Sequence, residues 1–254
     1  MILPHDETGR GAPVILLHAG VADRSMWSDH LPAMAAAGHR VLAMDLPGFG
    51  DAGLGPGPLA PWCDVLATMD TLGIPRAALV GNSWGAGMAL RAAAIAPDRV
   101  SHLVLVSAGD PWRQSPSSRL AAAWQAEEAA LAAGDIDGAV DAVLAAWTQP
   151  GAPDELRARV GAMQRRGFIE HAAKPEPDYA PDPIADGPEA LAGIRCPALC
   201  LAGEHDMPDF ADAAPALAAA LPDARHAVIP GAGHLAPLET PESFRAIVLE
   251  FLAA

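Results

Sequence analysis

The chain has 254 residues, of which 51% are hydrophobic and 19% are charged. This length suits one globular α/β domain with room for an insertion, and the composition argues against a disordered chain. Its formal net charge is −15, and its 15 Arg and one Lys are scattered along the sequence. Because a phosphate backbone binds to a basic surface, this charge disfavours nucleic acid as a partner.

Apolar runs of strand length recur along the chain. They lack the period-two alternation of half-exposed strands, which favours strands covered on both faces of a mostly parallel sheet. The predicted strands are residues 14–17, 41–44, 77–80, 103–106, 198–201 and 227–229. Stretches of helical length lie between or after them, at residues 27–37, 61–72, 83–96, 208–221 and 241–252. This alternation predicts an α/β fold with a doubly wound sheet flanked by helices.

Residues 111–190 interrupt the alternation. They contain no convincing strand but three helical segments, at 118–133, 135–147 and 153–172. We therefore expect a helical lid inserted into a core domain made of residues 1–110 and 191–254. The last part of this insertion, residues 174–190, holds five prolines among 17 residues, which predicts an irregular surface connection.

The segment LVGNSWGAG, residues 79–87, places Ser83 between Gly81 and Gly85. It follows a predicted strand and precedes a predicted helix, which is the context of a nucleophile elbow. In such a turn the two glycines avoid Cβ clashes while the serine adopts a strained backbone. The alternative is that Ser83 only caps the helix, since Ser is a preferred N-cap residue.

A base and an acid for Ser83 are available further along the chain. His234 lies in the glycine-rich loop GAGHLAP after the last predicted strand, where it could take the proton of the serine. Asp206 follows the strand in LCLAGEHD and could orient the imidazole. Glu204 and Asp209 lie close to it in the sequence, and Asp110, after another strand, is the reserve candidate for the acid.

An oxyanion hole needs two backbone N–H groups that point at one position. Trp84, the residue after the candidate nucleophile, supplies one, and Gly20, in the turn after the strand VILLHAG, is the candidate for the other. We interpret His18 in the same turn as a structural residue that braces the turn through hydrogen bonds.

Taken in order, VILLHAG, VLAMDLPGFG, LVGNSWGAGMAL, LCLAGEHD and GAGHLAPLETP resemble the α/β-hydrolase superfamily over essentially the whole chain. The resemblance implies a mostly parallel sheet of seven to eight strands with an inserted helical lid. It also implies Ser83 as nucleophile, Asp206 as acid, His234 as base, and Gly20 and Trp84 as oxyanion donors.

The sequence departs from the family pattern in two places. Ala19 follows His18 where the family usually has glycine. Only about a dozen residues precede the first core strand, so the usual antiparallel first strand is expected to be shortened or missing, which would leave seven strands instead of eight.

The resemblance predicts a serine hydrolase that cleaves carboxylic esters of small to medium, moderately apolar substrates. A serine nucleophile argues against haloalkane dehalogenases and epoxide hydrolases, which use a carboxylate. Carbon–carbon bond hydrolases share the elbow but tend to have Trp after the catalytic His, where this chain has Leu235. They rank second; enol-lactone hydrolases, cofactor-free perhydrolases and a ligand-sensing protein of the same fold stay open.

Candidate substrate-binding residues are large apolar side chains near the motifs or in the predicted lid. They are Trp27, Trp112, Trp124, Trp147 and Met207. Packing between the lid and the core is the alternative role for most of them.

The remaining expectations concern partners and location. We expect no cofactor and no metal, with Cys196 and Cys200 as buried thiols in a strand. The expected partner is a small-molecule substrate, and the protein would be a monomer or homodimer. No apolar run reaches the roughly 18 residues of a membrane span, and the N-terminus lacks the features of a signal peptide. We therefore expect a cytoplasmic protein without membrane contact.

Overall fold

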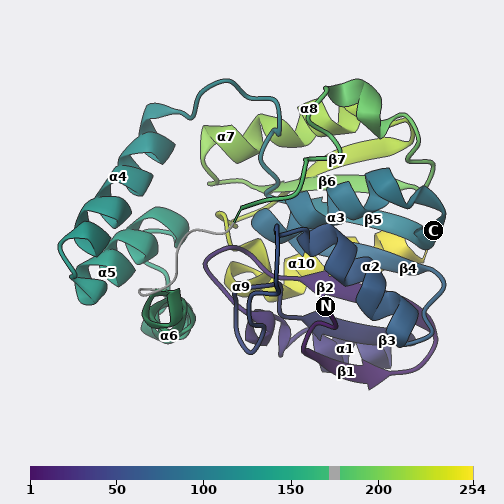
Figure 1. The fold of residues 1–254 in the computed structure, drawn as a ribbon, viewed down its shortest axis with the longest axis horizontal. Coiled ribbons are helices and arrows are strands. Elements are labelled where there is room, and N and C mark those ends of the chain that lie inside the picture. The colour runs from purple at the N-terminus through teal and green to yellow at the C-terminus, as the bar shows by residue number, and fades with distance from the viewer. Residues whose placement is uncertain (172–177, 254) are drawn as a thin grey trace.

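The computed structural model describes residues 1–171 and 178–253. A seven-stranded sheet forms the core, in the order β1-β3-β2-β4-β5-β6-β7 (Figure 1). Neighbouring strands are parallel except β1, which pairs antiparallel with β3. The strands are β1 (His5–Gly9), β2 (Ala12–Leu17), β3 (His39–Met44), β4 (Ala77–Asn82), β5 (Val100–Val106), β6 (Ala198–Gly203) and β7 (Ala224–Ile229).

All six predicted strands are present, and the sheet has seven strands, the lower of the two expected numbers. The antiparallel first strand, expected to be shortened or missing, is present as the five-residue β1. The additional strand, β1, has the polar sequence HDETG at the edge of the sheet. An edge strand of this composition carries no apolar run, which is why the hydrophobic pattern does not reveal it.

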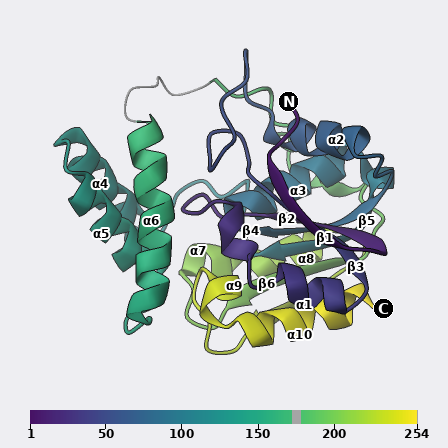
Figure 2. The same cartoon turned by 90° about the horizontal axis from the view of Figure 1, so that it is seen from below.

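Helices cover both faces of the sheet. The outer helices are α1 (Leu31–Ala36), α2 (Pro61–Thr71), α3 (Trp84–Ile95), α7 (Pro208–Ala211), α8 (Ala213–Ala220), α9 (Ala236–Glu239) and α10 (Pro241–Leu252). Alternate residues of each central strand enter two separate cores: Val14 and Leu16 pack with α1 and α10, whereas Ile15 and Leu17 pack with α2, α3 and α8. Figure 2 shows α1 and α10 on one side of the sheet and α2 and α3 on the other.

Two predicted helices are interrupted. In the stretch 27–37 only residues 31–36 are α-helical, as α1; the 3₁₀ turn Arg24–Trp27 ends at the first residue of the stretch. The stretch 208–221 is divided at Asp212 into α7 and α8. Pro215 lacks the N–H that would bond to Ala211, so the helical hydrogen-bond ladder cannot run on through this position.

The insertion forms three packed helices, α4 (Ser118–Ala132), α5 (Ile136–Trp147) and α6 (Asp154–His171), close to their predicted bounds. They stand beside the sheet rather than on one of its faces (Figures 1 and 2). The proline-rich connection is not only an irregular surface segment. Residues 174–177 lie outside the described part, but Pro188–Leu191 is a 3₁₀ turn and Ile184 is fully buried. The Trp112 indole donates to the Ile184 carbonyl over 2.7 Å, which draws this segment onto the core.

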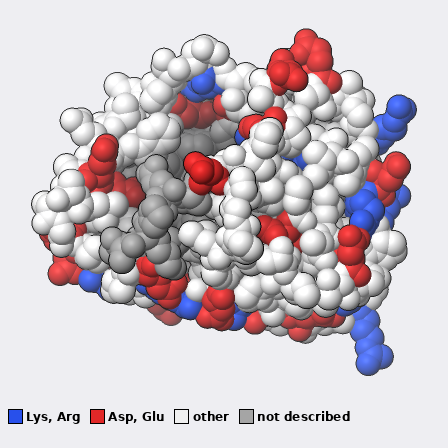
Figure 3. Space-filling view, in the orientation of Figure 1, with Lys and Arg blue, Asp and Glu red and all other residues white. Residues whose placement is uncertain are grey.

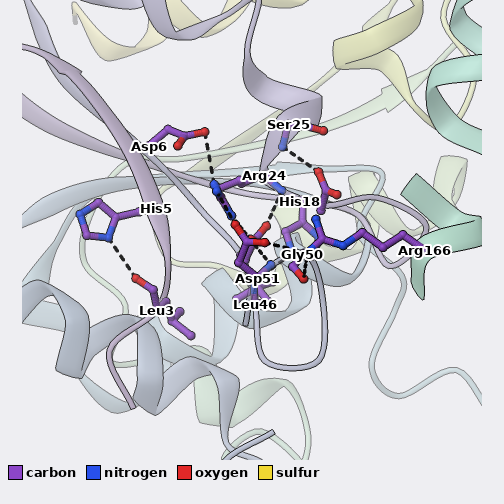
Figure 4. A network of polar contacts seen from close by, with 12 residues as sticks. Leu3, His5, Asp6, His18, Arg24, Ser25, Leu46, Gly50, Asp51 and Arg166 are labelled. Atoms are coloured by element: carbon purple, nitrogen blue, oxygen red, sulfur yellow. Dashed lines mark hydrogen bonds and ion pairs between the residues drawn. The ribbon is translucent and has the colours of Figure 1, made fainter. Parts of the chain in front are cut away.

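A polar network joins the insert to the core (Figure 4). Asp45, fully buried after β3, accepts the backbone N–H groups of Arg24 and Asp51, each at 2.8 Å, and pairs with the Arg24 guanidinium. Arg166 of α6 donates to the Gly50 carbonyl at 2.7 Å and to the Asp51 carboxylate at 2.6 Å. The network therefore anchors α6 to the loop that follows β3.

Candidate active site

Ser83 occupies the sharp turn between β4 and α3. Its φ of 54° and ψ of −116° lie in a region that residues other than glycine rarely adopt. A Cβ on Gly81 would lie 2.4 Å from the Ala86 nitrogen, and one on Gly85 would lie 2.4 Å from the His18 carbonyl oxygen. Glycine is therefore required on both sides of Ser83, for the steric reason that the sequence predicts.

The side chain of His234 bridges Ser83 and Asp206. The imidazole Nε2 lies 2.8 Å from Ser83 Oγ, and Nδ1 lies 2.9 Å from Asp206 Oδ1. A carboxylate only accepts hydrogen bonds, so Nδ1 carries the proton and Nε2 presents its lone pair to the serine hydroxyl. Each of the three residues follows the carboxyl end of a parallel strand, β4, β6 or β7, so the sheet brings them together.

The other three candidate acids have different partners. Asp209 accepts the backbone N–H of Ser117 at 2.7 Å and its hydroxyl at 2.5 Å, which fastens the segment that leads into α4. Glu204 accepts the N–H of Gly231 at 2.8 Å, and Asp110 accepts the N–H of Trp112 at 2.9 Å. In the described part of the chain, only Asp206 among these four bonds to His234.

Gly20 and Trp84 adjoin each other beside Ser83. A Cβ built on Gly20 would lie 3.5 Å from that of Trp84. Trp84 is the first residue of α3, so its N–H has no acceptor within the helix. Both residues line the same cavity as Ser83 and His234, and their role as oxyanion donors stays a prediction.

His18 braces the turn before Gly20. One ring nitrogen, Nδ1, donates to the Ala19 carbonyl at 2.8 Å, and Nε2 accepts the N–H of Leu46 at 3.0 Å. Burial lowers the pKa of His18, which keeps the ring neutral so that Nε2 can accept. Ala19, in place of glycine, is fully buried in this turn.

A cavity of about 1120 Å³ opens at Ser83 and His234. Figure 3 shows the hollow between the insert and the core, with acidic side chains around it. Among the predicted substrate-binding residues, Trp124 and Trp147 line this cavity. Trp124 is 50% exposed, whereas the Trp147 ring packs against the His234 imidazole with 4.6 Å between centroids.

Trp27, Trp112 and Met207 are not among the described residues that line this cavity, so their role as substrate contacts stays a prediction. Trp27 is fully buried against His30 and Phe244, beneath α10. The indole of Trp112 is held by its bond to the proline-rich connection, and Met207 is buried beside Asp206, whose carboxylate accepts its N–H at 2.7 Å.

Phe210 is a residue that the sequence does not reveal as part of the site. Its ring packs on the imidazole of His234 with 4.2 Å between centroids, so Phe210 and Trp147 both contact the histidine ring. In the sequence Phe210 reads as an ordinary core residue of a helix. Its position four residues after Asp206 was the available signal.

Charged residues also line the cavity. The acids are Asp110, Glu127, Glu128 and Asp182, and Arg91 is the only Arg or Lys among the described lining residues. Arg91 is engaged by Asp182, at 3.0 Å and 2.5 Å. Glu127 has no hydrogen-bond partner among the described residues, and burial raises the pKa of its carboxyl. In the sequence, Glu127 and Glu128 resemble a solvated helix face.

Among the described residues, no group of three or more His, Cys, Asp or Glu side chains is arranged to hold a metal ion. Within the same residues, no helix is both long and apolar enough to cross a membrane.

The family model described as alpha/beta hydrolase fold matches residues 12–241. This chain belongs to that family. A 2-hydroxy-6-oxononadienedioate/2-hydroxy-6-oxononatrienedioate hydrolase from Burkholderia vietnamiensis is 31% identical to this α/β hydrolase, over 98% of the chain and 90% of the relative. A 100-residue segment is 40% identical to the dihydrolipoyllysine-residue acetyltransferase component of an acetoin cleaving system from Pseudomonas putida; it covers 38% of this chain but only 27% of that protein.

Two solved structures resemble this hydrolase over nearly their full length. The enol-lactonase from Burkholderia xenovorans LB400 superposes with a TM-score of 0.80 and is 25% identical, with 99% of this chain and 96% of the other covered. A thermophilic esterase from Thermogutta terrifontis has a TM-score of 0.78 and 25% identity, and covers 99% of this chain and 93% of its own.

Proposed function

We propose that this α/β hydrolase is a serine hydrolase that cleaves uncharged esters or lactones of small to medium size. The observation that carries the proposal is the hydrogen-bonded chain from Ser83 Oγ through His234 to Asp206, open to the cavity. A serine hydroxyl is a weak nucleophile by itself, and an oriented neutral imidazole is the group that activates it.

In this mechanism the Ser83 proton passes to His234 Nε2 while Oγ bonds to the substrate carbonyl carbon. The oxyanion accepts the N–H groups of Gly20 and Trp84. Collapse of this intermediate expels the alkoxide, which takes the proton from His234 and leaves an acyl-serine. Water then gives a proton to His234 as it attacks the acyl carbon, and collapse restores the Ser83 hydroxyl and releases the acid.

The helical insert, residues 111–190, would serve as a lid over this reaction. The core domain would then consist of residues 1–110 and 191–254. Its contribution to the cavity supports this role, since Trp124 and Glu127 of α4 and Trp147 of α5 line the space above Ser83. Closing a lid excludes water and strengthens the electrostatic interactions of the site.

The charge of the cavity supports an uncharged substrate. A carboxylate substrate would meet four carboxyl side chains, while the one described cationic side chain is already paired with Asp182. Like charges in a partly desolvated site repel each other more strongly than in bulk water. The aromatic lining from Trp84, Trp124 and Trp147 favours a moderately apolar group.

Carbon–carbon bond hydrolysis is the second candidate, and the comparisons support it better than they support simple esters. A relative that aligns over nearly the whole chain is named as a hydrolase of a dienedioate or trienedioate, which are carboxylate anions. Such a reaction adds hydroxide to the carbonyl carbon and a proton to the carbon that leaves. The same Ser–His pair could serve both additions.

A panel of substrates assayed with the wild type and Ser83→Ala tests both candidates. The panel is p-nitrophenyl acetate, butyrate and octanoate, a γ-lactone, and a 2-hydroxy-6-oxo-dienoate. We expect a burst of p-nitrophenol and then steady turnover in the wild type, no burst with Ser83→Ala, and weak turnover of the dienoate. A wild type that cleaves the dienoate at least as efficiently as the esters would instead establish the second candidate. Equal activity in both proteins would refute the role of Ser83.

A further inference from the structure

Glu239 lies at the end of α9, five residues after His234 in the sequence. Its carboxylate turns back to residues 231–235, which we call the histidine loop. There Oε2 accepts the N–H of Gly233 at 2.6 Å. Gly233 directly precedes His234, so this bond fixes the backbone next to the imidazole. On the other side, Asn82 Nδ2 donates to the His234 carbonyl at 3.2 Å. The main chain of His234 is therefore held on both sides.

The second oxygen of Glu239 reaches the insert. Its Oε1 accepts the N–H of Gln149 at 3.0 Å, two residues beyond the end of α5. Gln149 returns a bond from its side-chain amide to the Gly231 carbonyl at 2.7 Å. Trp147, two residues earlier, is the residue whose ring packs on His234. The segment 147–149 thus contacts the histidine ring, the histidine loop and Glu239.

The charge of this carboxylate is partly removed from water, which costs free energy unless hydrogen bonds compensate for it. Burial raises the pKa of Glu239, and the N–H groups of Gly233 and Gln149, with the nearby His234, counteract only part of that effect. The two oxygens of this carboxylate each accept from a different segment and so hold the two segments in register. In a glutamine at this position an NH2 group, which cannot accept, would replace one of the two oxygens.

We propose that Glu239 is a positioning residue for His234, which holds the histidine loop in register with the α5 end of the helical insert. This inference rests on the proposed function, in which His234 is the base. Loss of the register displaces Nε2 from Ser83 Oγ, and a misplaced base slows the chemical step more than it weakens substrate binding.

The test compares Glu239→Gln with Glu242→Gln on the best ester of the panel. Glu242 is an exposed residue of α10 that pairs with Arg245, so its substitution removes the same charge away from the loop. We expect Glu239→Gln to lower kcat roughly 10-fold with KM within about twofold, from the loss of one charge-assisted hydrogen bond. Glu242→Gln should leave both parameters unchanged.

Amide hydrogen exchange gives a readout that does not depend on activity. We expect faster exchange of residues 231–235 in Glu239→Gln than in the wild type, and no change in Glu242→Gln. Gln149→Ala removes the bond to Gly231 and the side-chain interaction with Glu239 but keeps the backbone N–H that Glu239 accepts. It provides a milder second variant with the same direction of change in kcat and exchange. Wild-type kcat and exchange in both Glu239→Gln and Gln149→Ala would overturn the inference. A wild type without any hydrolysis would instead count against the proposed function, and exchange alone would then decide the role of Glu239 in the loop.

Discussion

Asn82 donates a hydrogen bond from Nδ2 to the main-chain carbonyl of His234, at 3.2 Å and across 152 residues of sequence. Its Nδ2 also lies 3.2 Å from the Val106 carbonyl, so one amide ties the ends of β4 and β5 to the histidine loop. Asn82 directly precedes Ser83. The end of β4 that carries the serine therefore also fixes the main chain of His234, whose side chain bonds to Ser83. The Ser83–His234 distance is therefore set by the backbone as well as by the side chains.

Asp206 should be the only one of the neighbouring acids whose loss abolishes activity. Asp206→Asn keeps the shape of the side chain but favours the wrong imidazole tautomer, so we expect kcat to fall by roughly 10³- to 10⁴-fold. Asp209→Asn and Glu204→Gln should lower kcat less than about tenfold, since their partners are Ser117 and Gly231. Steady-state kinetics of the three purified variants measure this difference. A loss with Asp209→Asn as large as with Asp206→Asn would contradict the assignment.

Gly85 and Gly87 form a matched pair on α3. A Cβ at residue 85 would lie 2.4 Å from two backbone oxygens of β2 and the turn after it, whereas one at residue 87 would meet only the flexible end of Arg91, at 3.2 Å. We expect Gly85→Ala to lower the free energy of unfolding by roughly 2 kcal/mol or more. Gly87→Ala should change it by less than about 1 kcal/mol, because alanine also favours the helix. Chemical denaturation measures both values, and equal destabilisation would contradict the close approach seen at Gly85.

Asp182→Asn should alter the charge selectivity of the cavity. The substitution releases Arg91 from its ion pair, so the guanidinium becomes available to a substrate carboxylate within the cavity. We expect kcat/KM for an anionic ester, such as a succinate half-ester, to rise roughly tenfold relative to an uncharged ester of the same length. Asp186→Asn is the control, because Asp186 is exposed on the same connection. An unchanged ratio in Asp182→Asn would mean that Arg91 does not face the substrate.

His30 should make the protein less stable at acidic pH. Burial lowers the pKa of His30 to about 4, only partly offset by its bond to the Pro237 carbonyl at 2.8 Å. The unfolded chain binds a proton near the ordinary pKa of about 6.5, and the folded protein does so only near 4, so stability falls as the pH drops through this window. This single residue accounts for a loss of roughly 3 kcal/mol by pH 4.

The measurement is the free energy of unfolding between pH 7 and pH 4 in the wild type and in His30→Asn. The variant loses packing against Trp27 and Phe244 and starts from a lower stability. Its slope against pH should nevertheless be shallower than that of the wild type, because one titrating group is gone. Parallel slopes would show that His30 does not titrate in this window.

Much of the fold follows from local patterns in the sequence. Continuous apolar runs predict six of the seven strands, and helical lengths between them predict the flanking helices and the three helices of the insert. The spacing of the glycines around Ser83 predicts the sharp turn, although the atoms that a Cβ on Gly85 would meet belong to Leu17 and His18, far away in the sequence. The pattern fails at β1, whose polar edge sequence carries no burial signal, and at Asp212, where a proline-bearing helix divides.

Residue types and chain order predict which side chains could form the site, but only the tertiary structure decides which of them meet. The sequence by itself determines that Ser83, His234 and several acids follow strand ends. The sheet order places the end of β6 beside the end of β7, and the turn after β6 brings Asp206, and not Asp209 or Glu204, against the imidazole. Burial likewise separates Trp147, which packs on His234, from Trp27, which is enclosed in the core. The physical reason is that strand and helix periodicity is set by residues a few positions apart, whereas cavities and hydrogen-bond partners depend on segments far apart in the chain.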